Sequence, residues 1–512
     1  MCGIFAYLSK DEKIDTGTLK ENGMKCQHRG PDKTNEQLIQ TDTSFNYFLF
    51  HRLSINGLNP KSDQPMKLQS NDNHILLCNG EIYNYRELAK EYNIQLETDS
   101  DCEIILHLYK LSRVSEFIKK LDGVFSFLIY DKSTHQVIVG HDPFGIRPFY
   151  YSHVNGEIIF SSEMKCLTEL TTEIKFYPPG SFSLIDLKTF DMKTYSYYPF
   201  KYQPIVDVDE TKIINTIQNK LEKAVQKRLV SDRPLGCLLS GGLDSSAITS
   251  IVCQQLGAEN VRTFAIGLEG SPDLLSAQKV ADYLGTNHTN VIVSETEMLE
   301  AIDETIYQIE SNDTTTIRAS VPMFLLSKYI RDHTDIKVIL SGEGSDEASG
   351  SYLYFHNAPN KSAFQEECLR LIKDVRYFDV LRGDKTTAGS GLELRVPFFD
   401  KEFMEYYMGI PPEKKMVREG MEKYLLRQAF VDKLPEEIVW RRKDGFSDGV
   451  SSFEKPWYEI INEYTQKVHG CSETEYYARI FLKYFPNQTN IIPYEWLPKW
   501  TDQNNPSGRL VI

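Results

Sequence analysis

The sequence predicts an α/β protein in which a β-rich part is followed by a part where strands and helices alternate. From residue 2 to about 200, short strand-like runs are separated by turn-rich pieces. After residue 210, apolar strand-like runs alternate with helical segments, which is typical of a parallel sheet covered on both faces. Two glycine- and serine-containing loops follow strands of this second part, where such sheets carry their ligand loops. We therefore expect two domains.

The composition narrows the function classes. The chain has 512 residues, of which 41% are hydrophobic, so it can bury ordinary cores. Its 72 acidic and 57 basic residues give a net charge of -15, which argues against nucleic acid and anionic membranes as partners. The nine cysteines are scattered without a C-x-x-C pair, so we expect reduced thiols. No signal peptide and no membrane-spanning apolar run is evident, so we expect a cytoplasmic protein.

The first part is expected to contain several strands and one helix. The helix is predicted at 101–111, where apolar side chains recur at helical spacing. Around 197–210, prolines and acids replace the strand pattern, and we place an exposed linker and the domain boundary there. The predicted strands are 3–8, 47–55, 74–80, 123–131, 136–142 and 157–163.

The second part opens with an amphipathic helix over 210–229, in which Ile213, Ile217 and Leu221 follow helical spacing. Further helices are predicted at 272–284 and 296–309. The sequence gives no clear signal after about residue 451. The predicted strands of this part are 234–239, 261–268, 289–294 and 336–341.

Cys2 directly follows the initiator methionine. Because the cysteine side chain is small, removal of Met1 is plausible and would give Cys2 a free α-amine of pKa near 8 beside a thiol of pKa about 8.5. One residue would then supply both base and nucleophile, as in N-terminal nucleophile hydrolases. The alternative is a chance cysteine in a frayed terminus, but the strand predicted from residue 3 would hold that terminus in a sheet.

A set of polar residues at strand ends matches the functional groups of glutamine. Arg52 can clamp an α-carboxylate with two parallel hydrogen bonds. Glu81 and Asp101 can hold the α-ammonium. The side-chain amide of Asn79 and the backbone N–H of Gly80 can receive the oxyanion that forms when a thiolate attacks the side-chain amide. Each residue alone is more often a surface charge or a turn former, so the prediction depends on the combination.

The loop "SGGLDSS" is predicted to bind an anion. It follows a strand and precedes a helix-compatible run, so the N–H groups of Gly241 and Gly242 face the end of that strand. Because the loop has no Walker lysine, it suits the departing pyrophosphate of ATP and favours adenylation over kinase chemistry. Asp244 could hold Mg²⁺. Further hydroxyl donors are Ser240, Ser245 and Ser246.

A second loop, "LSGEGSDEASG", also leaves an apolar strand. It carries Glu343, Asp346 and Glu347, and is too acidic to bind phosphate unaided. We expect these acids to lie beside a metal ion or near the ammonium of an acceptor.

These and other motifs make the chain resemble the glutamine-hydrolysing asparagine synthetases over nearly its whole length. The resemblance implies a glutaminase domain over 2–200, of the class II glutamine amidotransferase type, with the α-β-β-α sandwich of N-terminal nucleophile hydrolases. It implies a doubly wound parallel-sheet, pyrophosphate-loop ATP synthetase domain over 205–512. The motifs are "MCGIFAYL", "HRGPD", "HRLSIN", "NGEIYN", "SDCE", "DPFGIRPFY", "SSEMK", "LSGGLDSS", "FAIGL", "TTIRAS", "LSGEGSDE", "LELRVPFFD" and "RRKDGFSDG".

The resemblance also implies the reaction and its substrates. Ammonia released from L-glutamine would pass through an internal channel and attack β-aspartyl-AMP, which is made from L-aspartate and ATP with Mg²⁺. The products would be L-asparagine, L-glutamate, AMP and pyrophosphate. A homodimer would fit the family.

Site residues follow from the motifs by the same resemblance, with Cys2, Asn79, Gly80 and Glu343 expected to be catalytic. The expected glutamine site is Arg52, Leu53, Ser54, Ile55, Asn56, Asn79, Gly80, Glu81 and Asp101. The expected ATP site is Leu238, Ser240, Gly241, Gly242, Leu243, Asp244, Ser245, Ile266, Ser341 and Gly342. The expected site for aspartate and its intermediate is Thr315, Thr316, Arg318, Glu343, Asp346 and Lys443, and the expected metal ligands are Asp244 and Asp346.

Three positions depart from the family pattern, and two alternative functions stay open. Ser349, Ser351 and Leu394 replace the residues usual in the family, which affects local packing and the fit of the channel. One alternative is an amidotransferase of the same architecture that acts on another carboxylate, since fold does not settle substrate. The other is a binding protein that has lost turnover, and the joint retention of Cys2, Asp244, Glu343 and Lys443 argues against it.

Overall fold

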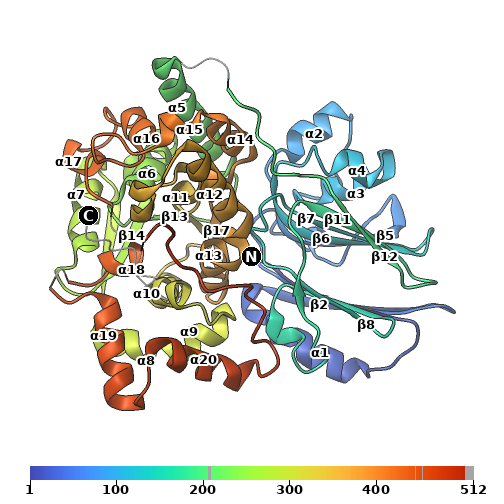
Figure 1. The fold of residues 1–512 in the computed structure, drawn as a ribbon. Coiled ribbons are helices and arrows are strands. Elements are labelled where there is room, and N and C mark those ends of the chain that lie inside the picture. The colour runs from blue at the N-terminus through green and yellow to red at the C-terminus, as the bar shows by residue number, and fades with distance from the viewer. Residues whose placement is uncertain (206–208, 444, 453, 502–512) are drawn as a thin grey trace.

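The structure is a computed structural model that describes residues 1–205, 209–443, 445–452 and 454–501. Two lobes lie side by side (Figure 1). We call residues 1–196 the N-terminal lobe and residues 209–501 the C-terminal lobe. The N-terminus lies between the two lobes rather than at the edge of the molecule (Figure 1).

The N-terminal lobe contains two six-stranded antiparallel sheets. The first has the order β10-β8-β9-β1-β3-β2 and the second the order β12-β11-β7-β6-β5-β4. The strands of the first sheet are β1 (Gly3–Ser9), β2 (Lys33–Gln40), β3 (Phe45–Arg52), β8 (Tyr150–Val154), β9 (Glu157–Ser161) and β10 (Lys175–Phe176). Those of the second are β4 (Met66–Leu68), β5 (Asn71–Ile82), β6 (Gly123–Asp131), β7 (Gln136–His141), β11 (Ser181–Asp186) and β12 (Met192–Ser196).

Alternation along the strands explains why the two sheets pack face to face. Ile4 and Ala6 of β1 pack with Leu77 and Leu128 of the second sheet in one buried cluster, whereas Phe5 belongs to the core on the other face. Helix α1 (Thr16–Met24) covers the outer face of the first sheet, and α2 (Tyr85–Glu91), α3 (Glu103–Leu111) and α4 (Val114–Phe117) lie over the second (Figure 1). The predicted α-β-β-α sandwich is therefore confirmed.

The C-terminal lobe is built on a five-stranded parallel sheet of order β15-β14-β13-β16-β17. The strand order reverses between β13 and β16, so the predicted doubly wound sheet is confirmed and its switch point lies there. The strands are β13 (Leu235–Leu238), β14 (Arg262–Gly267), β15 (Asn287–Ile292), β16 (Val338–Leu340) and β17 (Glu393–Arg395).

Helices surround this sheet on both faces (Figure 1). They are α5 (Glu210–Lys227), α6 (Leu243–Leu256), α7 (Pro272–Leu284), α8 (Glu295–Glu300), α9 (Ile302–Ile309), α10 (Thr314–His333), α11 (Ser345–Ser349), α12 (Lys361–Asp374), α13 (Asp379–Ala388), α14 (Lys401–Gly409), α15 (Pro412–Lys415), α16 (Tyr424–Ala429), α17 (Glu436–Val439), α18 (Phe446–Gly449), α19 (Trp457–Tyr464) and α20 (Glu473–Tyr484).

Some predicted elements differ from the observed ones. The helix predicted at 296–309 is two helices, because a capping box at Ser294 starts α8 and the chain turns at Ala301 before α9. The linker is exposed only in part: Tyr197 and Tyr198 are buried, and the ring of Tyr198 packs on Phe144. Residues 206–208 of the linker lie outside the described residues. The segment after 451, which gave no signal, forms α19 and α20.

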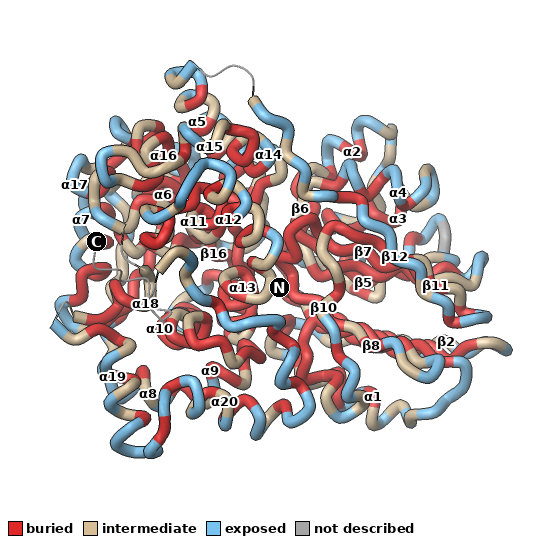
Figure 2. The backbone as a smooth tube through the Cα atoms, in the orientation of Figure 1, coloured by how far each residue is buried: buried red, intermediate tan, exposed pale blue. Residues whose placement is uncertain are grey.

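Buried ion pairs join the two lobes. Arg29 of the N-terminal lobe lies 2.7 Å from the carboxylate of Asp384 in α13, and Arg147 lies 3.2 Å from the same group. Lys385 of α13 pairs with Glu163 at 3.2 Å. Figure 2 shows the buried region continuing across this contact. Because a buried charge is costly once it loses its partner, these pairs fix α13 against the N-terminus.

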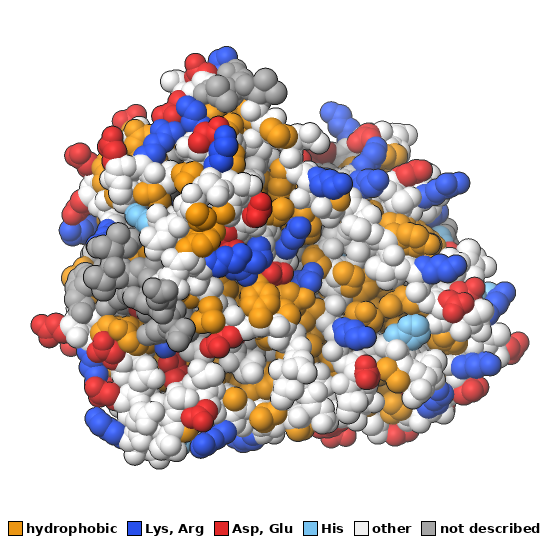
Figure 3. All heavy atoms as spheres, viewed as in Figure 1, with side chains coloured by type: hydrophobic (Ala, Val, Ile, Leu, Met, Phe, Trp, Pro, Cys, Tyr) orange, Lys and Arg blue, Asp and Glu red, His pale blue; other side chains and the backbone are white. Residues whose placement is uncertain are grey.

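The surface carries charges of both signs, and the cysteines form no disulfide bonds. On the face in Figure 3, acidic and basic side chains are interspersed. All nine cysteines are free. In the described ranges we find no helix that combines the length and the apolar character needed to cross a bilayer.

Candidate active sites

The N-terminal pocket is the cavity around Cys2, at the ends of β1, β3 and β5. The structure brings together there most of the predicted glutamine site: Cys2, Arg52, Leu53, Ile55, Asn56, Gly80, Glu81 and Asp101. Two predicted residues lie beside the cavity and not in its wall. Asn79 bonds the backbone of Cys2, and the N–H of Ser54 donates to Asp32 at 2.8 Å. Glu393 of the C-terminal lobe completes the wall.

The environment of Cys2 depends on Met1. With Met1 in place, the Cys2 thiol lies 3.7 Å from the carbonyl oxygen of Leu53, and burial raises the pKa of the thiol to about 11. Met1 is itself 1% exposed, and burial lowers the pKa of its α-amine to about 6. In this form the thiol is protonated at neutral pH and has no amine of its own, so the chain with Met1 lacks an activated nucleophile.

Asn79 is arranged as a hydrogen-bond donor toward the pocket. Its side-chain oxygen accepts from the N–H of Cys2 at 2.9 Å, which fixes the orientation of the amide. Its Nδ2 atom is buried and finds no hydrogen-bond partner within the described chain. A buried donor without a partner is costly, and an oxyanion formed at Cys2 would satisfy it. Gly80 follows it in β5, where a Cβ atom would lie 2.1 Å from the carbonyl oxygen of Val124.

Two acids of the N-terminal pocket are poorly neutralised. Burial raises the pKa of Asp101 to about 6, and burial together with Asp101 raises the pKa of Glu81 well above its usual range. The nearest cation to Glu81 is Arg395, at 3.4 Å. Arg52 lines the same pocket but is already bonded to Asp63 at 2.6 Å. The pocket would therefore favour a ligand that places a positive charge beside Glu81 and Asp101.

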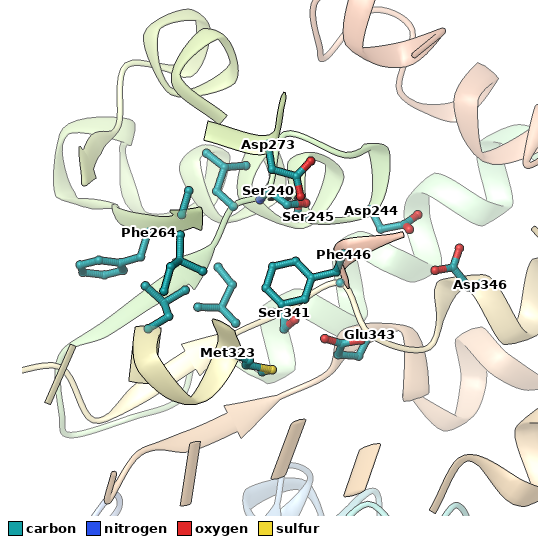
Figure 4. A pocket seen from close by; sticks show the side chains of 16 residues that line it. Ser240, Asp244, Ser245, Phe264, Asp273, Met323, Ser341, Glu343, Asp346 and Phe446 are labelled. Carbon is teal, nitrogen blue, oxygen red and sulfur yellow. Dashed lines mark hydrogen bonds between the residues drawn. The ribbon is translucent and has the colours of Figure 1, made fainter. Parts of the chain in front are cut away.

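The C-terminal cleft consists of three adjoining cavities at the switch point of the parallel sheet. The first has a volume of about 110 Å³ and contains most of the predicted ATP site: Leu238, Ser240, Asp244, Ser245, Ile266, Ser341 and Gly342. Figure 4 shows Phe264 and Met323 at one end and the carboxylates of Asp244 and Asp346 at the other. The cavity is thus apolar at one end and charged at the other.

Glycines let the two predicted loops approach each other. A Cβ atom on Gly342 would lie 2.9 Å from the backbone nitrogen of Ser245. Gly241 has a φ of 70° and would clash with Ser276 if it carried a side chain. Gly241 does not line the cavity, so it shapes the loop while Gly242 caps α6.

The wall of the second cavity of the cleft carries more cations than carboxylates, and its acids Asp244, Asp273 and Glu422 pair with three of the cations. The start of α6, with Gly242 and Leu243, meets Lys423, Arg427, Arg441, Arg442 and Lys443 in its wall. A helix N-terminus facing a group of cations is suited to a polyphosphate.

The third cavity, which we call the acceptor cavity, has a volume of about 140 Å³. It contains the predicted residues Thr315, Thr316, Glu343, Asp346 and Lys443. Asp313 caps α10 by accepting from the N–H of Thr316 at 2.9 Å and from its hydroxyl at 2.7 Å, which orients Thr316.

Asp346 lies between two lysines at the junction of the cavities. Its two oxygens lie 2.6 Å from Lys423 and from Lys443, and these lysines outweigh its burial and lower its pKa well below the usual range. Lys423 also bonds Asp244. Glu343 lies 2.7 Å from Arg382, but burial is the larger effect and raises the pKa of Glu343.

Arg318, also predicted for the aspartate site, is not among the residues that line the acceptor cavity. Arg318 is buried, and its Nε lies 2.8 Å from Glu473 of α20. Glu473 belongs to the segment for which the sequence gave no signal.

Sequence reasoning also missed several residues of the cleft. Asp313 could have been found as an N-cap residue before α10. Trp496 could not have been found in this way, because it is 183 residues from Asp313 in the sequence. Its backbone N–H donates to the Asp313 carboxylate at 2.8 Å. The other missed residues are Tyr352, Asp379, Arg382 and Lys423, whereas Glu347, which the sequence analysis singled out, does line the acceptor cavity.

Comparisons with known proteins bear on both lobes. A family model described as glutamine amidotransferase domain matches residues 1–190, and the model asparagine synthase matches 216–366 and 357–490. The chain is 39% identical over 556 residues to a Homo sapiens protein named asparagine synthetase (glutamine-hydrolyzing), covering 99% of this chain and 98% of the relative. A Gallus gallus protein of the same name is 38% identical over 558 residues, with the same coverage of both chains.

The chain belongs to the glutamine-hydrolysing asparagine synthetase family. As a member of this family it is a carbon–nitrogen ligase that makes asparagine with glutamine as the nitrogen donor. The N-terminal pocket around Cys2 lies in the lobe that matches the amidotransferase model, and the C-terminal cleft lies in the lobe that matches the synthase model.

Proposed function

We propose that the N-terminal pocket hydrolyses glutamine at Cys2 and that the C-terminal cleft adenylates aspartate, so that ammonia from the first site displaces AMP in the second. The observation that carries this proposal is the pair of separate sites, each with its own set of convergent groups. The N-terminal site combines the Cys2 thiol with the unpartnered amide donor of Asn79. The C-terminal site combines the glycine–serine loop with the three cavities of the cleft.

The proposed glutaminase step begins with removal of Met1. The freed α-amine of Cys2 takes the thiol proton, the sulfur attacks the side-chain carbonyl carbon of glutamine, and Asn79 Nδ2 stabilises the oxyanion. Ammonia leaves with the proton, and water then releases glutamate from the thioester. Glu81 and Asp101 would hold the α-ammonium, and Arg52 the α-carboxylate.

The proposed adenylation step uses all three cavities of the cleft. The adenosine of ATP would lie in the first cavity, against Phe264 and Ile266, and its β- and γ-phosphates in the second cavity. Aspartate would lie in the acceptor cavity. Its β-carboxylate oxygen then attacks the α-phosphorus, and pyrophosphate leaves. Glu343 lines both the first and the acceptor cavity, so it is placed to take the proton when ammonia attacks the adenylate.

The donor set of the cleft fits Mg²⁺. Asp244 and Asp346 both bond Lys423, so two carboxylates already converge on one positive charge. Carboxylate and phosphate oxygens are the ligands Mg²⁺ takes, and the ion would neutralise phosphate charge when bound. Among the described residues no three His, Cys, Asp or Glu side chains form a ready-made metal site, so ATP would have to supply the remaining oxygens.

A continuous line of buried groups supports transfer of ammonia between the lobes. Met1, which precedes Cys2, contacts Arg147, and Arg147 donates to the carbonyl oxygen of Leu394 at 3.2 Å. A Cβ atom on Gly383 would lie 2.7 Å from Leu394 and 3.9 Å from Glu343. Removal of Met1 would open space at the start of this line.

The test is a product assay with ATP, aspartate and glutamine. We expect AMP, pyrophosphate, glutamate and asparagine in equal amounts. ADP in place of AMP would refute adenylation, and AMP formed only with another carboxylate would favour the alternative acceptor. Mass spectrometry of active protein should show Cys2 at the N-terminus. The cytoplasmic location and the homodimer expected from the sequence stay predictions, as does a role for Arg318.

A further inference from the structure

Strand β17 of the C-terminal lobe reaches the N-terminal pocket. Its first residue, Glu393, lies in the wall of that pocket together with Cys2 and Glu81. Its last residue, Arg395, places its Nη2 atom 3.4 Å from Oε2 of Glu81. The C-terminal lobe therefore contributes charged side chains to the surroundings of Glu81.

Three hydrogen bonds fix the guanidinium of Arg395, which is 0% exposed. Its Nε donates to Glu393 at 2.8 Å, and its Nη1 donates to the carbonyl oxygens of Arg228 and Val230 at 2.8 and 2.7 Å. Because a guanidinium is planar and presents its donors in a fixed fork, these bonds also set the direction of Nη2.

The Nη2 atom adds charge to Glu81 without filling its acceptor sites. It is buried, and among the described residues it makes no hydrogen bond. The Oε2 atom of Glu81 accepts from Nδ2 of Asn56 at 2.5 Å instead. A cation that faces an acid in this way stabilises its charge and leaves oxygen lone pairs for a ligand.

The segment 228–233, to which Arg395 is bonded, also supports a second wall of the pocket. The N–H of Asp232 donates to the carbonyl oxygen of Ile55 at 3.1 Å, and the Asp232 carboxylate accepts from the N–H of Gly57 at 2.8 Å. Ile55 lines the pocket. Arg395 thus joins Glu81 and this wall to one buried edge of the C-terminal lobe.

We propose that Arg395 is a positioning residue for glutamine hydrolysis, which acts from the C-terminal lobe by fixing the place and the charge of Glu81. This inference rests on the proposed function of the N-terminal pocket, in which Glu81 holds the α-ammonium of glutamine. Arg395 is separated from that ligand by Glu81, so it acts through this acid and not on the reacting atoms.

The charge of Glu81 gives the inference its clearest readout. Burial, Asp101 and Glu393 raise the pKa of Glu81, and Arg395 opposes them. Without Arg395 the pKa of Glu81 would rise further, so a smaller fraction of it would be ionised at neutral pH. The ionisable side chains around it are Cys2, Arg52, Cys78, Asp101, Cys102, Arg147, Glu393 and Arg395.

The test measures kcat and KM for release of glutamate from glutamine, and synthesis of asparagine from ammonium chloride. We expect Arg395→Met to raise the KM for glutamine by roughly 10- to 100-fold at pH 7, with a smaller fall in kcat, because the acid that binds the substrate loses its cation. Synthesis from ammonium chloride should change by less than about threefold, although Arg395 belongs to the C-terminal lobe.

The pH dependence and two further variants separate positioning from folding. The KM of Arg395→Met should fall more steeply between pH 6.5 and 8.5 than that of the unmodified enzyme, because Glu81 then ionises without help. Arg395→Lys keeps the charge and should recover part of the loss.

Arg228→Lys is the matched control. Arg228 is also buried, donates to a backbone carbonyl oxygen, that of Ala224, at 2.9 Å, and lies over the ring of Tyr83 in the N-terminal lobe. Its carboxylate partner is Asp400, at 3.0 Å, and not Glu81. The control should leave the KM for glutamine and its pH dependence unchanged.

Three results would overturn the inference: an Arg395→Met enzyme with a normal KM for glutamine, one that loses hydrolysis and ammonium-dependent synthesis to the same degree, and one whose KM is raised by the same factor at every pH. If the unmodified enzyme releases no glutamate from glutamine, the proposed function of the N-terminal pocket fails instead. The two failures are therefore distinguishable.

Discussion

The acids Glu81 and Asp101 of the N-terminal pocket and the cleft carboxylate Asp346 differ in how their buried charge is balanced before substrate arrives. In the N-terminal pocket, the pKa values of Glu81 and Asp101 are raised because burial exceeds the help of Arg395. In the C-terminal cleft, Asp346 is held by two lysines that lower its pKa. Under the proposed function, the ligand would bring a cation to Glu81 and Asp101, whereas phosphate and metal would replace the lysine contacts of Asp346.

The two sites also differ in whether the reactive residue, Cys2 or Glu343, is complete in the folded chain that carries Met1. The cleft has Glu343 and its loops in place in the folded chain, but Cys2 lacks its amine until Met1 is removed. Under the proposed mechanism, removal of Met1 would activate the glutaminase site and would not be needed for the synthetase site. This difference predicts that the two activities can be separated by single substitutions.

The largest expected effect comes from Cys2→Ala and Glu343→Gln, used as a reciprocal pair. Cys2→Ala should lower glutamine-dependent synthesis by roughly a thousandfold or more, since no other thiol or amine replaces the nucleophile, and should leave synthesis from ammonium chloride close to normal. Glu343→Gln should reduce synthesis from both nitrogen sources and spare glutamine hydrolysis. Product quantification of asparagine and glutamate measures both.

A Cys2→Ala enzyme that still hydrolyses glutamine would show that the nucleophile is assigned wrongly. Full asparagine synthesis by Glu343→Gln would remove its proposed role. Loss of both activities in either variant would contradict the separation of the two sites.

A smaller effect is expected at the contact between the lobes. Leu394 is 1% exposed and lies between Arg147 and Gly383 on the line toward Glu343. Leu394→Phe should obstruct that line and leave glutamine hydrolysis intact, so the ratio of glutamate to asparagine should rise several-fold. Synthesis from ammonium chloride that enters the cleft directly should change much less.

Leu394→Met, of nearly the same volume, is the control and should keep the ratio near that of the unmodified enzyme. If Leu394→Phe keeps glutamate and asparagine equal, ammonia does not pass this residue.

Much of the fold could be predicted because local pattern and final structure agree. The helix predicted at 272–284 is α7, with Pro272 at its first position and Gly285 after its end. The runs at 123–131 and 136–142 are β6 and β7 almost to the residue. Strand β2 was missed because it is a sheet edge whose side chains are mostly polar, and β17 because it is three residues long.

The sites were predictable where a loop or strand end carries the chemistry, and not where distant segments meet. Cys2, Asn79 and Asp244 lie in short motifs, and the folded chain brings Cys2 and Asn79 together at one pocket and places Asp244 in the wall of the cleft. The partner of Arg318 could not be read from its motif, because Glu473 is 155 residues away. Trp496 was missed for the same reason. Pairing across the core is decided by packing, which sequence spacing does not encode.

The smallest expected effect concerns Lys415, a buried lysine that lies outside both candidate sites. Lys415 is 3% exposed, its Nζ lies 3.9 Å from the sulfur of Met408, and across the described residues no carboxylate lies within 4 Å of it. Burial lowers its pKa from 10.5 to about 8. Between pH 8 and 10.5, Lys415 binds fewer protons in the folded state than in the unfolded state. The free energy of unfolding therefore increases as pH rises through this range.

Lys415→Met should therefore stabilise the protein most at pH 7 and below, by up to about 3 kcal/mol, with activity unchanged. The gain should shrink as pH approaches 10, because the lysine of the unmodified protein is then neutral in the folded state. Urea unfolding of both proteins at pH 7, 8, 9 and 10 measures the difference. A gain that stays constant across this range would mean that packing, and not the buried ammonium, limits stability here.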